Sequence, residues 1–97
     1  MPIPQSFMSA EDAALAQAFR AILGRKITRR RKDTRWSQEA LANESGWSRQ
    51  QLSRVENGIS SIGADRLVAL ALVLETEITE LMSTMEEIKR EVDLHRT

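Results

Sequence analysis

The spacing of apolar residues along this 97-residue chain predicts helices throughout. Between residues 10 and 33 apolar side chains recur every three or four positions, the period of an amphipathic helix, and a capping box beginning at Ser9 opens this segment. Residues 64–74 are rich in alanine, leucine and valine and predict a buried helix. With two short helices within residues 37–57 and a last helix over residues 77–97, the chain is predicted to have an all-α fold of five helices.

The last predicted helix, residues 77–97, has the a/d spacing of a coiled-coil seam. It holds only about two and a half heptads, too few for a stable isolated helix. The seam therefore needs a partner, which is either a second copy of the chain or the body of the same chain, and we favour the second copy. The alternative dimer interface is the N-terminal extension of the first predicted helix. The expected dimerisation residues are Ile78, Leu81, Met85, Ile88 and Val92.

Residues 36–58 predict two short helices separated by a tight turn. Ser37 is a favourable N-cap for the first helix, and Gly46 stands just past its end, where a left-handed residue is favoured. Ser48 begins the second helix and forms a capping box with Gln51. Two short helices joined by a glycine turn form the helix-turn-helix unit, whose second helix enters the DNA major groove.

The motif SQEALANESGWSRQQLSRVENG, which spans the predicted unit at residues 37–57, resembles the lambda-repressor/Cro-like (XRE) helix-turn-helix family. Further matching positions outside the motif are Leu23, Gly24, Ile27, Arg31, Leu67, Leu70, Ala71, Leu74, Ile78 and Leu81. The resemblance implies a five-helix lambda-repressor-like DNA-binding domain over residues 10–81, here with extended N- and C-terminal helices. Residues 1–9 are expected to form a flexible arm before the domain.

The net charge of the chain is zero, but its charges are separated along the sequence. Between residues 20 and 54 there are ten basic and three acidic residues, a balance of +7. From residue 56 onward four basic and nine acidic residues give a balance of −5. A basic segment that includes the predicted unit favours contact with nucleic-acid phosphates.

The composition argues against several other classes of protein. The chain has no cysteine, which excludes disulfides and a zinc-finger framework, and its one histidine, His95, has no neighbouring motif that would build a metal or catalytic site. It also lacks a P-loop and a GxGxxG motif, so we expect no metal, no cofactor and no enzymatic activity. No apolar run is long enough to span a membrane and no signal peptide is evident, so we expect a cytoplasmic protein without membrane contact.

The second helix of the unit carries the side chains expected to read the DNA sequence. Arginine donates two hydrogen bonds to guanine and glutamine pairs similarly with adenine, each discriminating by about 1–3 kcal/mol. The family resemblance implies base contacts by Arg49, Gln50 and Arg54, and the alternative is a solvated polar face. The complete expected set of base-contacting residues is Ser48, Arg49, Gln50, Ser53 and Arg54.

Four other residues are expected to contact DNA phosphates, which position the domain without reading its sequence. Gln38 lies at the N-terminus of the first helix of the unit, where free N–H groups and the helix dipole favour an anion. The resemblance implies that Gln38 also steadies the recognition helix and that Asn57 flanks the groove. Arg35 and Lys32 complete the set because they lead directly into this surface.

Two further pairs are expected to be structural. Arg31 and Glu56 match positions that the family uses for a partly buried salt bridge between the first helix and the end of the recognition helix. Trp36 and Trp47 stand at positions where the family has smaller core residues, so both indoles are expected to be partly buried rather than to contact DNA.

These features together predict a sequence-specific DNA-binding transcriptional regulator, a repressor or autoregulator that binds a palindromic operator in double-stranded DNA as a homodimer. The alternative is a protein-interaction module, such as an antitoxin, that binds a partner protein through its C-terminal helix. The presence of Arg49, Gln50 and Arg54 favours the first interpretation.

Overall fold

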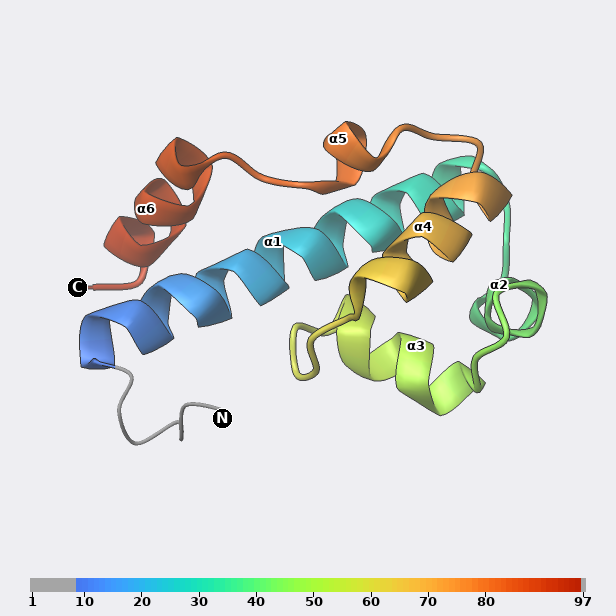
Figure 1. Ribbon diagram of the computed structural model, residues 1–97, viewed down its shortest axis with the longest axis horizontal. Helices are drawn as coiled ribbons and strands as arrows, with labels where there is room; N and C mark the ends of the chain where they lie inside the picture. Colours follow the sequence, from blue (N-terminus) through green and yellow to red (C-terminus); the bar gives the residue numbers. More distant parts are fainter. Residues whose placement is uncertain (1–8, 97) are drawn as a thin grey trace.

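The computed structural model describes residues 9–96, and this part of the chain contains helices and loops but no strand (Figure 1). The predicted all-α fold is therefore confirmed. The arm expected over residues 1–9 lies outside the described residues except for Ser9, the N-cap of the first helix. The described helices are α1 (Ala10–Asp33), α2 (Gln38–Glu44), α3 (Arg49–Glu56), α4 (Ala64–Val73), α5 (Ile78–Leu81) and α6 (Met85–Leu94).

The 24-residue helix α1 is the axis on which the other helices pack. Helices α2, α3 and α4 surround its C-terminal half, α5 lies beside that half, and α6 lies against its middle and N-terminal part (Figure 1). The Ser9 hydroxyl accepts a hydrogen bond from the Asp12 amide at 3.0 Å, which caps the helix where the sequence predicts its start. One long helix thus holds the predicted helix-turn-helix unit at one end and the C-terminal segment at the other.

The main hydrophobic core joins α1 to α2, α3, α4 and α5. Gly24 permits the close approach of α1 to α3, because a Cβ at this position would lie 2.5 Å from the carbonyl oxygens of Val55 and Glu56. Glycine costs helix stability in α1, but any larger residue would force the two helices apart. The largest fully buried side chains of the core are Ile27, Leu41, Leu52, Leu70, Leu74 and Leu81.

The C-terminus of α4 is capped by a side chain of α1 rather than by a glycine. Glu75 follows the helix with a left-handed backbone, at φ 52°, a conformation that costs a residue with a Cβ about 1–2 kcal/mol. Arg30 offsets this cost by donating from Nε to the Leu74 carbonyl at 3.0 Å and from Nη2 to the Glu75 carbonyl at 2.9 Å. This arginine therefore satisfies helix-end carbonyls that lie 44 and 45 residues away in sequence.

The structure corrects the prediction of one continuous helix over residues 77–97. Helix α5 ends at Leu81, Met82 adopts an extended backbone with ψ 157°, and a new helix starts after Thr84. Thr84 and Glu87 form a capping box, which competes with a continuous helix by satisfying the free amides of a new N-terminus. The two helices share one apolar spacing in sequence, and this concealed the break.

The C-terminal segment folds back on its own chain, which is the alternative to the predicted dimer seam. Ile88 is 6% exposed and packs with Ala18 and Ile22 of α1, and Leu81 is 1% exposed in the main core. Val92 packs against the same small cluster, whereas Ile78 and Met85 are exposed. Leu81 and Ile88 are therefore corrected from dimer contacts to intramolecular core residues, because α1 already buries the face that the seam would use.

Charged groups reinforce the contact between α6 and α1. Arg25 donates two hydrogen bonds to the Glu91 carboxylate, at 2.7 and 3.1 Å, and Lys26 Nζ lies 3.1 Å from Glu87 Oε2. His95 Nε2 lies 3.1 Å from Glu91 Oε2, the oxygen that also accepts from Arg25 Nη1. The hydrogen bonds from Arg25, aided by His95, hold the pKa of Glu91 below the ordinary carboxyl value despite its burial.

Replacing Glu91 with glutamine should weaken this contact in a pH-dependent manner. At pH 7 the substitution should lower the free energy of unfolding by about 0.5–1 kcal/mol, since Arg25 stays largely hydrated. The native pKa of Glu91 is lowered, so its contribution is present above pH 4.5 and disappears as the pH falls through the native value. Urea unfolding followed by circular dichroism at pH 7 and pH 3 measures this difference.

The matched control for this experiment is Glu86→Gln, which removes a carboxylate whose side chain is 82% exposed on the same helix. Its effect at pH 7 should be smaller. An equal loss for Glu91→Gln at both pH values would show that the carboxylate charge does not stabilise the docked helix.

Candidate nucleic-acid interface

The turn between α2 and α3 has the geometry that its sequence predicts. The Ser37 hydroxyl caps α2 by accepting from the Ala40 amide at 3.0 Å, and Gly46 adopts the left-handed backbone at φ 75°. Ser48 Oγ then accepts from the Gln51 amide at 3.1 Å, while the Gln51 side chain accepts from the Ser48 amide at 3.0 Å. This capping box fixes the N-terminus of α3, whose first turn carries the candidate base-reading residues.

Helix α3 has one buried face and one polar face. Leu52 and Val55 are in the core, whereas Arg49 and Gln50 are exposed at the N-terminal tip. The expected base-reading residues Arg49 and Gln50 therefore lie side by side on the outer surface of the helix, where long side chains can reach base edges.

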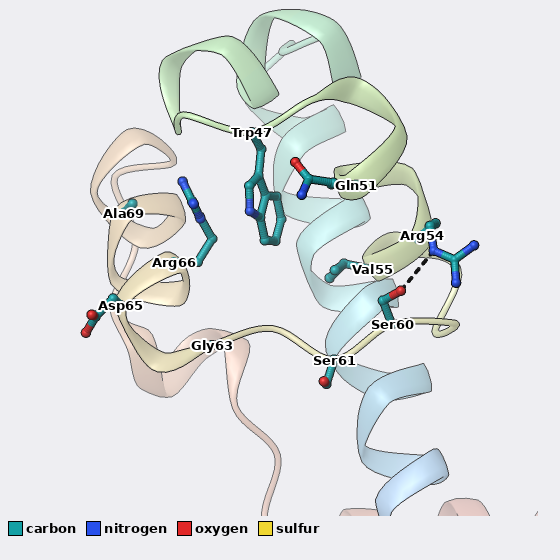
Figure 2. A pocket seen from close by; sticks show the side chains of 10 residues that line it. All are labelled: Trp47, Gln51, Arg54, Val55, Ser60, Ser61, Gly63, Asp65, Arg66 and Ala69. Atoms are coloured by element: carbon teal, nitrogen blue, oxygen red, sulfur yellow. Dashed lines mark hydrogen bonds between the residues drawn. The ribbon is translucent and has the colours of Figure 1, made fainter.

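The other three expected base-reading residues are already engaged within the protein. Arg54 is exposed, and its Nε donates to Ser60 Oγ at 3.0 Å, which ties its guanidinium to the loop after α3 (Figure 2). The hydroxyl of Ser48 serves as the N-cap of α3. Ser53 is half-buried, and its Oγ accepts from the side-chain nitrogen Nδ2 of Asn57 at 3.4 Å.

A buried polar network fixes the C-terminal end of α3 to the other helices. Arg31 of α1 donates to the Glu56 carboxylate from Nε at 2.7 Å and from Nη2 at 3.1 Å, and both side chains are almost fully buried. Gln38 at the start of α2 donates to the same carboxylate at 2.8 Å. Arg31 also donates to the Trp36 carbonyl at 2.9 Å, so the network connects three helices and the loop between α1 and α2.

The four residues expected to contact phosphates fall into two groups. Gln38 and Asn57 are engaged within the protein: Gln38 donates to Glu56, and the Asn57 amide donates to the Ser53 carbonyl at 2.9 Å. Lys32 and Arg35 are exposed at the end of α1 and in the following loop, where Arg35 has a left-handed backbone with φ 65°. Only the second group thus presents a cationic side chain to solvent.

A cleft of about 700 Å³ separates α3 from α4 beside this surface. The Trp47 indole points into the cleft, with Arg66 of α4 on one side of the ring and Gln51 on the other (Figure 2). Trp36 and Trp47 are both half-buried against the main core. Sequence reasoning did not single out Arg66, although it is the one basic residue between Arg54 and Lys89.

Other kinds of site find no support in residues 9–96. This part of the chain contains no group of three histidine, cysteine, aspartate or glutamate residues placed to hold a metal ion. None of the described helices is both long and apolar enough to cross a membrane. The polar surface of α3 and its surroundings is therefore the candidate functional site.

Two short helices at a glycine turn, with a capped second helix presenting polar side chains, define a helix-turn-helix domain. The family model described as Helix-turn-helix matches residues 27–81, more than half of the chain. The chain therefore belongs to the helix-turn-helix family, of the lambda-repressor/Cro-like (XRE) type, and is a DNA-binding transcriptional regulator. A search of curated proteins found no match.

Solved structures with the same fold include three bacterial proteins. The restriction-modification controller protein C.AhdI from Aeromonas hydrophila is 30% identical, with a TM-score of 0.66 over 68% of this chain and 96% of that one. The hypothetical transcription factor NHTF from Neisseria is 28% identical, with a TM-score of 0.65 over 77% and 86%. The clp gene regulator ClgR from Corynebacterium glutamicum, 22% identical with a TM-score of 0.66 over 78% of each chain, is similar in fold.

Replacing Glu56 with alanine should destabilise the domain strongly, because it leaves the Arg31 guanidinium buried without its carboxylate. Removing one partner of a buried ion pair costs about 3–5 kcal/mol. Urea unfolding at pH 7 measures the loss, with Glu44→Ala on the exposed end of α2 as the control. A loss for Glu56→Ala no greater than that of the control would show that the network does not hold α3 in place.

Proposed function

We propose that this protein represses transcription, including that of its own gene, by binding a palindromic operator as a homodimer. The supporting observation is the pair Arg49 and Gln50, exposed at the capped tip of α3, whose opposite end is held by the Glu56 network. A rigid helix with exposed bidentate donors at its tip suits the reading of base edges in the major groove. Arg54, held by Ser60, is the third proposed base contact.

Lys32 and Arg35 are proposed phosphate contacts because both are exposed cations near the start of the helix-turn-helix unit. For Gln38 and Asn57 we propose that steadying α3 is the main role, since their side chains already donate hydrogen bonds to it. A regulator of this kind acts where the genome lies, so the proposal places it in the bacterial cytoplasm. It assigns no catalytic activity to the chain.

The proposed dimer uses α4 rather than the C-terminal seam. Val68 and Leu72, one helical turn apart on α4, are 43% and 73% exposed, and Ile78 is exposed at the start of the adjoining helix α5. An apolar patch can meet its own copy across a two-fold axis, and here the exposed carboxylates of Glu75, Glu77 and Glu80 lie at its edge. Helix α4 lies beside α3, whereas α6 lies farther from α3 (Figure 1). A dimer through the patch on α4 would therefore hold the two recognition helices closer together than a dimer through α6.

A partner protein bound through the C-terminal helix is the second interpretation of the sequence. The inner apolar face of α6 is covered by α1, so a partner would have to displace α6 or use its outer face. The exposed large apolar side chains at the two ends of that helix are Met85 and Leu94. We therefore place DNA binding first.

Selection of binding sites from a random duplex library at near-physiological salt tests the DNA-binding proposal. The wild type should enrich a palindrome. Arg49→Ala and Gln50→Ala, tested separately, should each erase the base preference at one position per half-site, which lowers the discrimination there by about tenfold or more. Lys89→Ala, which removes an exposed positive charge from α6, should keep the same palindrome. Enrichment unchanged by both tip variants would place base reading elsewhere.

Leu72→Glu should produce monomers, because the charge would be desolvated at the centre of the proposed interface. Losing the second half-site contact should lower operator affinity by about a hundredfold. Sedimentation velocity measures assembly, and DNA titration at fixed salt measures affinity. Leu94→Glu is the matched control, since this leucine is 69% exposed at the other end of the molecule, and a Leu72→Glu protein that is still dimeric would place the interface on another face.

A further inference from the structure

Arg66 makes three contacts with the turn of the helix-turn-helix unit from the first turn of α4. Its Nη1 donates to the Ser45 carbonyl at 2.8 Å and to the Gly46 carbonyl at 3.0 Å. Its Cζ lies 5.4 Å from the centre of the Trp47 ring, a cation–π distance. One side chain thus contacts the three consecutive residues that precede the N-cap of α3.

The position of these contacts matters because they reach the turn before α3 from the side of α4. Helix α3 packs on α1 and α2, and the cleft of about 700 Å³ lies on the side that faces α4. Trp47 projects into this cleft, and Arg66 lies on one side of its indole ring (Figure 2). At Gly46 a Cβ would lie 3.0 Å from Arg66 Nη1, so the glycine that closes the turn also leaves room for the guanidinium.

We infer that Arg66 is a positioning residue for sequence recognition, acting through the turn and Trp47 on the tilt of α3. Glu56 fixes the C-terminal end of α3 from the side of α1, and Arg66 fixes the N-terminal end from the side of α4. Small changes in the tilt of α3 move Arg49 and Gln50 most, since these residues lie at the tip. This inference rests on the proposed function, because it assigns Arg66 to the reading of an operator.

The geometry separates this role from a direct phosphate contact. Arg66 is half-buried, one of its terminal nitrogens is shared between two backbone carbonyls, and its guanidinium lies over the indole. A phosphate-binding arginine instead presents its donors to solvent and contributes equally to all DNA sequences. The two roles therefore predict different ratios of operator binding to random-sequence binding.

The first experiment uses the protein without DNA. In a Trp36→Phe background, Trp47 is the only indole, so its emission reports on its surroundings. Arg66→Gln should change the emission maximum and increase acrylamide quenching of Trp47, because the guanidinium no longer covers the ring. Arg66→Lys should restore part of the protection. An Arg66→Gln spectrum identical to that of the parent would overturn the proposed contact with Trp47.

The second experiment titrates the selected operator and a random duplex of equal length at several salt concentrations. Arg66→Gln should bind the operator about tenfold more weakly and the random duplex with unchanged affinity, with Arg66→Lys between Arg66→Gln and the wild type. Arg90→Gln, at an exposed side chain of α6, is the control and should change neither affinity. A protein that still unfolds cooperatively in urea shows that a reduced ratio is not due to unfolding.

Two results would overturn the inference while leaving the proposed function in place. Equal losses on both duplexes, with the salt slope reduced by about 0.9, would make Arg66 a phosphate contact. An unchanged ratio of operator to random binding for Arg66→Gln would show that Arg66 has no positioning role. If the wild type itself shows no preference for any duplex, the proposed function fails and the recognition role of Arg66 fails with it, whatever the Trp47 emission shows.

Discussion

The buried carboxylate of Glu56 is the group on which the orientation of the recognition helix depends. Desolvating an ion pair costs several kcal/mol per charge, so the pair is favourable only when hydrogen bonds satisfy both partners. Here Oε2 accepts from Arg31 Nε, and Oε1 accepts from both Arg31 Nη2 and Gln38 Nε2. Because these three bonds come from two helices, they define the direction of α3 at its C-terminal end, and a hydrophobic contact of similar size would permit sliding or rotation.

The two ends of α3 are therefore held by different chemistry. The C-terminal end is held by a buried charge pair that tolerates little displacement. The N-terminal end is held by the exposed capping box of Ser48 and Gln51 and by the half-buried guanidinium of Arg66. Solvent competes for these N-terminal contacts, so they are individually weaker. The position of Arg49 and Gln50 therefore depends on weaker contacts than the position of Glu56.

Most of the fold was predictable because its signals are local. The N-caps at Ser9, Ser37 and Ser48 can each be recognised from three or four consecutive residues. The structure places a helix start after each of them. The break before α6 was missed although the Thr84 capping box is also local, because the apolar spacing continues across it. The contacts of Arg66 could not be predicted in the same way, since backbone carbonyls about 20 residues distant carry no signature in sequence.

In the structure, the acidic C-terminal segment and the basic first helix are joined by ion pairs. Two acidic residues of α6, Glu91 and Glu87, pair with Arg25 and Lys26 near the middle of α1. Both partners lie outside the 27–81 region that matches the family model. Helix α6 thus neutralises two of the positive charges of α1. Lys32, Arg35, Arg49 and Arg54 are exposed on or near the helix-turn-helix unit, where their positive charge can attract DNA phosphates.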